Sequence, residues 1–404
     1  LATAQLDLST GSVFDYTPTS NVQVTLINPA ASGTASGATL LLGSEDSAGV
    51  ASTFSTTIYT GTGAAQTITN GIDLSSGGLV WIKPRSVKPN VLQHKTSHYL
   101  SSNTTDAEIA DTRLVTQFNS NGFNVGIYGG VNSSSDSLVS WTFKKQAKFF
   151  DIVTWTGNGT AGRTISHNLG TTVGCVMIKN TSNAENWMVY HIGSGIDGQL
   201  NLNTDAAATD DSSQFNDTVP SSTTLTLGGN AEVNANGQTY VAYLFAHDTD
   251  ATSIIKCGNY TGTGSAGKAV TLGWEPQWLM IKRTDATGYS WEIMDAQRGF
   301  VSGNDKVLRA NSQGAEITSY DYGAPTSTGF ELTTDIAVNA SGGNYIYMAI
   351  RNLSIPTITY DPNLQWSGGT APTAPATGEK DVITFNTTDG GTTYKSALAL
   401  DGAK

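Results

Sequence analysis

The sequence repeats three short motifs, in the same order, three times. The first is an aromatic residue followed by Thr-Gly-x-Gly, at 59–63, 155–159 and 260–264. The second is an apolar run that ends in lysine, at 80–83, 176–179 and 279–282. The third is a Val-Asn pair ahead of another apolar run, at 131–132, 233–234 and 338–339. The copies are about 100 residues apart, which is the size of a small domain and too long for a solenoid or propeller period.

Composition and patterning predict an all-β fold. Only 13% of the residues are charged and 44 are glycine, while Ser, Thr and Asn fill most polar positions. Glycine allows the positive φ of tight turns, and Asn, Asp and Ser bond to nearby backbone, so this mixture suits short strands joined by turns. The apolar runs are short and alternating, without helical spacing. For each repeat we expect a sandwich of two antiparallel sheets, of jelly-roll or lectin-like type.

The second repeat shows the expected strands most clearly. They lie at 152–155, 163–169, 175–179, 187–191, 225–227 and 240–245. We expect 187–191 to pair back on 175–179 as a hairpin. The three repeats are therefore assigned to residues 44–148 (repeat 1), 149–250 (repeat 2) and 251–354 (repeat 3).

The two ends of the chain lie outside the repeats and also contain strand-like runs. Each end is only 40–50 residues long, too short to bury a stable sheet alone. We expect residues 1–43 and 355–404 to form one split anchoring β-domain into which the repeats are inserted. A strand at 22–28 or 38–42 should then pair with one from 357–400. The Asp-Gly-Gly at 389–391 predicts a hairpin turn.

Charge and composition exclude several classes of partner. The net charge is −12 and no basic cluster offsets it, so nucleic acid is not an expected partner. No apolar run is long enough to span a membrane. Cys175 and Cys257 fall at non-equivalent places in their repeats, so we expect neither a disulfide framework nor a bridge between them.

Several motifs resemble functional sites, but their context favours structural roles. Gly-x-Gly-x-x-Gly occurs at 157–162 and 262–267, yet strand-like rather than helical residues follow, so we expect turns and no nucleotide site. His94 and His98 are four apart without the helical setting of a zinc site. Acidic runs at 205–211 and 248–250 lack the spacing of a calcium loop. We expect no metal, no cofactor and no catalytic residues.

Aromatic residues are the best candidates for ligand binding. Trp187 and His191 should point to one side of their strand, as should Trp291 and Asp295, because side chains alternate with a period of two. Sugars stack on exposed aromatic faces, so these four residues form a candidate carbohydrate site. The alternative is that Trp187 and Trp291 belong to the core of the sandwich.

Both chain ends resemble a β-domain of fibre and structural proteins from tailed, marine-type bacteriophages. The resemblance rests on Asp-Leu-Ser-Thr-Gly at 7–11, Asn-Pro-Ala-Ala-Ser-Gly-Thr at 28–34, Trp-Ser-Gly-Gly-Thr-Ala-Pro at 366–372 and the run at 387–394. The repeats, notably 148–160 and 186–191, are similar to an uncharacterised β-domain of the same phage proteins. Repeat 3 departs at 291–295, and repeat 1 has no matching tryptophan after its second motif.

This resemblance implies a non-enzymatic virion protein on the particle surface. We expect a tail fibre, spike or appendage module that contacts other virion proteins and a host-surface glycan or protein. It also implies a homo-oligomer, most simply a trimer with C₃ symmetry. The alternatives are a head-decoration protein of the capsid, a depolymerase of host polysaccharide and a bacterial surface adhesin.

Overall fold

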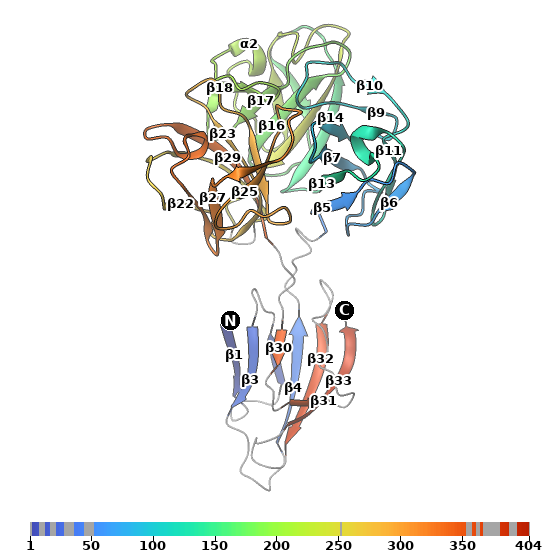
Figure 1. Ribbon diagram of the computed structural model, residues 1–404, viewed down its shortest axis with the longest axis vertical. Helices are drawn as coiled ribbons and strands as arrows, with labels where there is room; N and C mark the ends of the chain where they lie inside the picture. Colours follow the sequence, from blue (N-terminus) through green and yellow to red (C-terminus); the bar gives the residue numbers. More distant parts are fainter. Residues whose placement is uncertain are drawn as a thin grey trace. The chain divides into compact units, whose positions relative to one another are not determined.

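The chain forms two compact units in this computed structural model: residues 1–51 with 353–404, and residues 52–352 (Figure 1). The structure describes residues 52–250 and 253–352 throughout. Outside them it describes only the strands given in the next paragraph, together with the side chains of 382–384. Each unit is described by itself.

Both ends of the chain supply strands to the sheets of the first unit. One sheet has the order β1-β3-β30 and the other β2-β4-β32-β33-β31. Val22 pairs with Ile358, and Gly43 with Lys380, so both N-terminal runs that we expected to pair with the far end do so. The Asp-Gly-Gly turn lies outside the described residues. The strands are β1 (Ala2–Asp7), β2 (Val13–Tyr16), β3 (Val22–Ile27), β4 (Ser36–Gly43), β30 (Ile358–Tyr360), β31 (Leu364–Trp366), β32 (Lys380–Thr387) and β33 (Tyr394–Ala403).

Parallel and antiparallel pairs occur together in this unit. β1 to β4 alternate between the two sheets, so that strands adjacent in one sheet are separated along the chain by a strand of the other. The pairs β1–β3 and β2–β4 therefore run parallel, since each crossover returns the chain to its first direction. β4, β32 and β33 pair antiparallel.

In the second unit each repeat has a main sheet and a small sheet, and their strands pair antiparallel. The main sheets are β5-β13-β7-β8, β14-β20-β16-β17-β18 and β21-β29-β23-β24-β25-β26. In each, the first strand of the repeat lies beside the last, and the last lies beside the strand of the second motif. The small sheets are β11-β12-β6, β15-β19 and β22-β28-β27, and repeat 1 adds the pair β9–β10.

The bounds of these elements match the expected strands closely in repeat 2. Only β18 and the short helix α2 were not expected there. Repeat 1 contains β5 (Phe54–Thr60), β6 (Gln66–Ile68), β7 (Gly78–Pro84), β8 (Val91–Gln93), β9 (His98–Tyr99), β10 (Ile109–Ala110), β11 (Val115–Asn119), β12 (Gly122–Val125), α1 (Gly129–Asn132) and β13 (Ser137–Lys144). Repeat 2 contains β14 (Phe150–Thr156), β15 (Arg163–Ser166), β16 (Val173–Asn180), β17 (Met188–His191), β18 (Gly195–Asn201), α2 (Ser212–Phe215), β19 (Thr224–Leu227) and β20 (Thr239–Ala246). Repeat 3 contains β21 (Ile255–Thr261), β22 (Lys268–Thr271), β23 (Pro276–Arg283), β24 (Glu292–Asp295), β25 (Asp305–Arg309), β26 (Ile317–Tyr320), β27 (Gly323–Thr326), β28 (Gly329–Leu332), α3 (Ile336–Asn339) and β29 (Asn344–Arg351).

Each main sheet is covered on both faces. In repeat 1, Val80 and Ile82 of β7 share one hydrophobic core with Ile68 and Phe123 of the small sheet. Trp81 is on the opposite face of β7 and is also fully buried. Two covered faces explain why the second motif is a continuous apolar run rather than an alternating one.

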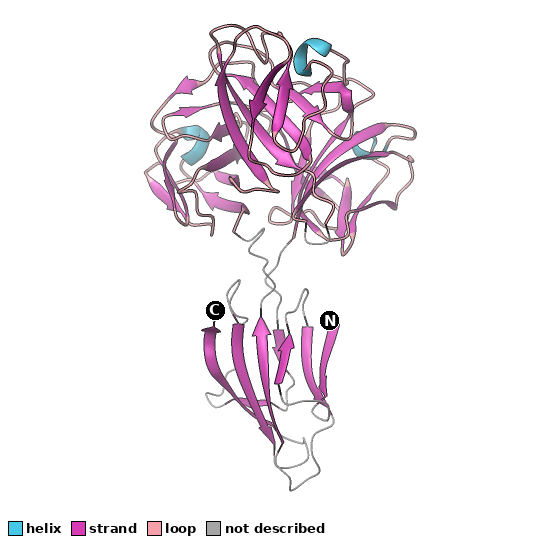
Figure 2. Cartoon of the chain, turned by 180° about the vertical axis from the view of Figure 1, so that it is seen from behind, coloured by secondary structure: helices cyan, strands magenta, loops and turns pink. Residues whose placement is uncertain are grey.

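The second faces of the main sheets meet in an aromatic centre shared by all three repeats. Figure 2 shows the strands of these sheets in magenta. Phe143 of repeat 1 lies 5.4 Å from Phe245 of repeat 2 and 6.2 Å from Trp278 of repeat 3, between ring centroids. Trp141 and Trp278 are 6.4 Å apart in edge-on geometry. Such edge and tilted contacts between aromatic rings add to the stabilisation from burial.

The repeats form a closed ring, because one backbone hydrogen bond recurs at all three contacts between them. Glu108 N–H donates to Thr181 O (3.1 Å), Ala208 N–H to Thr284 O (2.8 Å) and Glu316 N–H to Arg85 O (2.9 Å). The three acceptors are equivalent, since each lies two residues after the lysine of the second motif. We call these contacts seam 1/2, seam 2/3 and seam 3/1. Only seam 3/1 joins repeats that are not consecutive in the chain.

Candidate functional site

The four residues of the candidate carbohydrate site are buried at the seams. Trp187 Nε1 donates to Ser101 O of repeat 1 (2.9 Å), and Trp291 Nε1 to Asn201 O of repeat 2 (3.0 Å). His191 Nε2 bonds to Tyr347 O of repeat 3 (3.0 Å). None of these three side chains, nor Asp295, is more than 1% exposed. Stacking of a sugar needs an exposed ring face, so the structure does not support such a carbohydrate site at these residues, and their burial matches the alternative of a core role.

Repeat 1 makes the equivalent contact through a different residue. Asn90 is equivalent to Trp187 and Trp291, because each directly precedes the residue that pairs with the isoleucine of the second motif. Its Nδ2 lies within hydrogen-bonding distance of the Arg309, Ala310 and Ser312 carbonyls of repeat 3. A donor at this position therefore bonds to the neighbouring repeat at every seam, which explains why repeat 1 needs no tryptophan there.

A buried ion network closes seam 3/1. Asp295 Oδ2 accepts from Arg298 Nε (2.6 Å) and from Trp141 Nε1 of repeat 1 (3.0 Å). Arg298 Nη1 lies 3.3 Å from Glu316 Oε1, and Glu316 pairs with Arg85 of repeat 1 through two contacts of 2.9 Å to its Nε. Asp295 therefore joins two repeats, a role that its place in the sequence did not reveal.

The lysine that ends the second motif is buried in all three repeats. Lys179 Nζ donates to Thr105 O across seam 1/2 (3.0 Å), and Lys282 Nζ to Asp205 O across seam 2/3 (3.4 Å). Lys83 Nζ donates to Lys88 O within its own repeat. Burial lowers the pKa of all three lysines to about 8. The repeated lysine thus bonds to loop carbonyls and is not exposed to a ligand.

The glycine motifs form turns, as expected. Gly159 and Gly264 have φ of 69° and 70° at matching places. Strands β15 and β22, not helices, begin directly after Gly162 and Gly267. This geometry offers no helix N-terminus for a nucleotide phosphate.

The asparagine of the third motif holds each glycine turn. Asn234 Oδ1 accepts from Asn158 N–H (3.1 Å), while its Nδ2 donates to Thr160 O (2.9 Å) and Gly228 O (3.0 Å). Equivalent bonds are made by Asn132 and Asn339. The aromatic residue of the first motif completes the arrangement by donating to the valine carbonyl before the asparagine, at Tyr59, Trp155 and Tyr260.

The histidines and cysteines considered in the sequence have internal partners or are buried. His94 Nδ1 bonds to Tyr243 Oη across seam 1/2 (2.9 Å), and burial lowers the pKa of His94 to about 4. His98 Nδ1 bonds to Ser97 Oγ (2.8 Å). Cys175 and Cys257 are free thiols in the interior.

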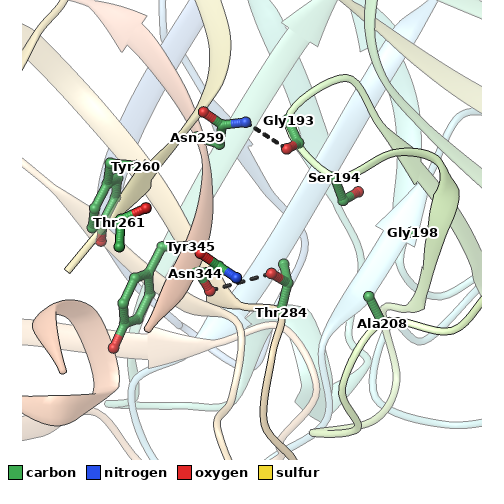
Figure 3. A pocket seen from close by; sticks show the side chains of 10 residues that line it. All are labelled: Gly193, Ser194, Gly198, Ala208, Asn259, Tyr260, Thr261, Thr284, Asn344 and Tyr345. Carbon is green, nitrogen blue, oxygen red and sulfur yellow. Dashed lines mark hydrogen bonds between the residues drawn. The ribbon is translucent and has the colours of Figure 1, made fainter. Parts of the chain in front are cut away.

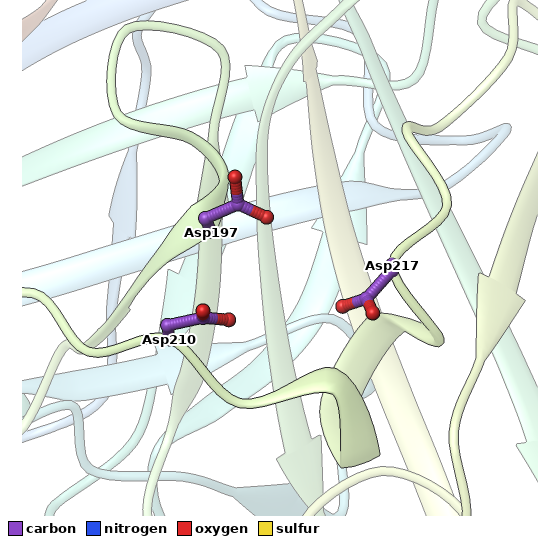
Figure 4. Close-up of side chains that lie close together, drawn as sticks. All are labelled: Asp197, Asp210 and Asp217. Atoms are coloured by element: carbon purple, nitrogen blue, oxygen red, sulfur yellow. The ribbon is translucent and has the colours of Figure 1, made fainter.

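Three exposed carboxylates of repeat 2 lie close together (Figure 4). Oxygens of Asp197, Asp210 and Asp217 are within 4.8 Å of one another. Only Asp210 belongs to the acidic run at 205–211 that the sequence singled out. Exposed acidic groups cluster in this way without an ion, so the arrangement by itself does not define a cation site.

Two polar clefts occupy equivalent places on the ring. The cleft at seam 2/3 has a volume of about 270 Å³ and lies between β21 and β29 of repeat 3 and the 193–208 segment of repeat 2 (Figure 3). The cleft at seam 1/2 has a volume of about 420 Å³ and lies between β14 and β20 of repeat 2 and residues 94–108 of repeat 1. An aromatic pair lies behind one wall of each cleft, Tyr260 stacked on Tyr345 and Trp155 on Tyr240, and none of the four side chains is more than 8% exposed.

These clefts were not expected from the sequence, although a signal was present. Thr156 and Thr261 belong to the first motif, and Thr181 and Thr284 lie two residues after the lysine of the second. All four line the clefts. Repeated polar residues beside repeated landmarks could have indicated a shared surface.

Comparison with known proteins gives one family match. The model of a family described as "Domain of unknown function (DUF7483)" matches residues 50–352, which contain the ring. No curated protein matches the chain. A solved structure titled "Crystal Structure of the STIV MCP" aligns over 80% of this chain and 94% of its own, at 8% identity and a TM-score of 0.14, too low to carry an argument. In the described part of the chain no helix is long and apolar enough to cross a membrane.

Proposed function

Because the chain belongs to the DUF7483 family, which has no assigned function, we propose its role from its own architecture and from the resemblance of its ends to phage fibre proteins. It is a non-enzymatic structural protein of a tailed-phage virion, in a tail fibre, spike or appendage that contacts the host surface. Residues 52–352 are three tandem β-sandwich repeats inserted into a split anchoring β-domain.

One observation carries the proposal: the ring is closed, and the chain enters and leaves it from the unit that contains both termini. The ring is therefore joined to the rest of the chain by two polypeptide segments rather than by one. A body built this way suits repeated mechanical contact, since opening it requires buried seams to separate.

The buried charged groups support a structural role. Asp295 and Arg298 bind each other within seam 3/1, and Glu292 accepts from Arg309 at 3.0 Å. Asp305 Oδ2 accepts from two backbone N–H groups. Carboxylates held by cations or backbone donors in the interior are not available to a polysaccharide substrate, unlike the acid pair of a glycosidase.

In the particle we expect this chain to contact other virion proteins and to form a closed homo-oligomer, most simply a trimer. Partners that bind only the folded state stabilise it by mass action, which suits a protein that works outside a cell. Sedimentation should give a species of three times the 42.3 kDa chain mass. A stable monomer at micromolar concentration, with one copy per site in the particle, would exclude the trimer.

The location of the chain tests the proposed function. Virions of the encoding phage are purified, the chain is identified by mass spectrometry, and an antibody against residues 52–352 is placed by electron microscopy. Label on the tail or an appendage supports the proposal. Label on the head surface replaces it with capsid decoration, and absence of the chain from particles refutes it. Release of reducing ends from host polysaccharide by the purified chain would establish a depolymerase instead.

A further inference from the structure

We propose that the clefts at seams 1/2 and 2/3 bind a neutral saccharide. This inference rests on the proposed function, because it names the class of host-surface ligand that the ring would contact. The surface proposed here is different from the buried residues that the sequence suggested, which are Trp187, His191, Trp291 and Asp295.

The cleft at seam 2/3 is lined by uncharged polar groups. Ser194, Asn259, Thr261, Thr284 and Asn344 line it (Figure 3), whereas the rings of the Tyr260–Tyr345 pair lie in the hydrophobic core on the other face of the sheet. Among the described residues, neither the Thr261 hydroxyl nor the Asn344 side-chain amide has a hydrogen-bond partner. Hydroxyl and amide groups donate and accept, as do the hydroxyls of a sugar.

The shape of this cleft also suits a sugar ring. Gly193, Gly198 and Ala208 form the opposite wall, and their small side chains leave the space open. Asn259 Nδ2 donates to Gly193 O across the cleft (2.7 Å), which holds the two walls together. A volume of about 270 Å³ is near the lower end of ligand pockets and fits one or two sugar rings. No charged side chain lines the cleft, so a neutral ligand is favoured over an anion or a cation.

The cleft at seam 1/2 adds an acceptor that lacks a donor. Thr154, Thr156, Thr181 and Thr239 supply hydroxyls at this seam. Glu108 also lines the cleft, and its side chain is 9% exposed. Its Oε2 pairs with Lys95 Nζ (2.6 Å), while its Oε1 is buried and has no hydrogen-bond partner in the described structure. An unpaired buried carboxylate oxygen is costly, and a sugar hydroxyl would satisfy it.

Seam 3/1 shows how such a cleft can be filled. Arg85 occupies the position of Thr181 and Thr284, and Glu316 that of Glu108 and Ala208. The Arg85–Glu316 ion pair therefore lies where seam 2/3 has open space lined by uncharged groups, and where seam 1/2 has Glu108 paired with Lys95. The chain itself supplies a design for closing the two clefts.

The experiment copies this ion pair into the open seams of the full-length chain. Thr284→Arg with Ala208→Glu fills seam 2/3, and Thr181→Arg fills seam 1/2, where Glu108 is already present. Thr223→Arg, at an exposed loop position away from the clefts, is the charge control. Circular dichroism and thermal melting verify that each variant keeps its fold. The probes are glucose, galactose, mannose, N-acetylglucosamine, N-acetylgalactosamine, lactose and maltose, measured by saturation-transfer NMR.

We expect at least one probe to bind with a Kd on the order of 1 mM, as is reasonable for a ligand of this size. Affinity should fall at least tenfold when both clefts are filled and stay unchanged in Thr223→Arg. The absence of binding by every probe, or binding that survives the filled clefts, overturns the proposal. Either result leaves the position of the chain in the virion unaffected, so it is distinguishable from failure of the proposed function.

Discussion

Replacing Asp295 with asparagine should destabilise the ring strongly. Asp295 and Arg298 are both fully buried, with 2.6 Å between Oδ2 and Nε. The amide keeps the volume but removes the negative charge, so the buried guanidinium loses its nearest counter-ion. Breaking such a pair costs about 3–5 kcal/mol. The contact of Arg298 with Glu316 places the expected loss toward the lower value.

Urea unfolding followed by tryptophan fluorescence measures this loss, because every tryptophan except Trp366 lies between residues 52 and 352. With a slope of about 3 kcal/mol per molar urea, a loss of about 3 kcal/mol lowers the midpoint by about 1 M. Asp285→Asn is the matched control, since Asp285 pairs with Arg283 at 2.8 Å but both side chains are partly exposed. The control should cost less than about 1 kcal/mol. Equal midpoints for the two variants would refute the role of the buried network.

Two further perturbations test the histidine and the glycine turns. Burial lowers the pKa of His191 to about 3, below the usual 6.5. The contribution of neutral His191 to stability is therefore complete above pH 6.5 and is lost as the pH falls toward 3. Between pH 7 and 4 the free energy of unfolding should fall by about 3 kcal/mol for this reason. His191→Gln should therefore show a smaller fall in urea midpoint over that range, and an identical fall would contradict the assignment. In Gly157→Ala the new Cβ would lie 2.1 Å from Ala235 O, whereas at Gly237 (φ +77°) it meets open space. We expect the free energy of unfolding to fall by about 3 kcal/mol in Gly157→Ala and by about 1 kcal/mol in Gly237→Ala, measured by the same unfolding assay. The reverse order would show that backbone movement relieves the clash.

The sequence predicted those parts of the fold that each repeat makes with its own residues. The first and third motifs recur because the aromatic residue and the asparagine bond to each other's loops, as Trp155 and Asn234 do. Strands β16, β17 and β20 were also predictable, since their hydrophobic patterns and turns are local. The all-β class follows from such local signals.

Contacts between repeats could not be predicted in the same way. The position of Trp187 beside a strand is equally compatible with an exposed face, its own core or a neighbouring repeat. Only the three-dimensional structure shows that Trp187 bonds to Ser101, a residue that is far away in the sequence. Asn90 shows the difficulty most clearly, because a polar residue replaces a tryptophan while making an equivalent contact.

Because the three repeats are joined in one polypeptide, their three interfaces do not have to be identical. In a trimer of separate single-repeat chains, rotational symmetry would copy each interface substitution three times. Here Arg85 and Glu316 can meet at one interface while Thr284 and Ala208 meet at another, because different codons specify them. A single mutation therefore changes one third of the assembly, and natural variation can alter ligand preference at one interface while the ion-paired interface continues to hold the assembly closed.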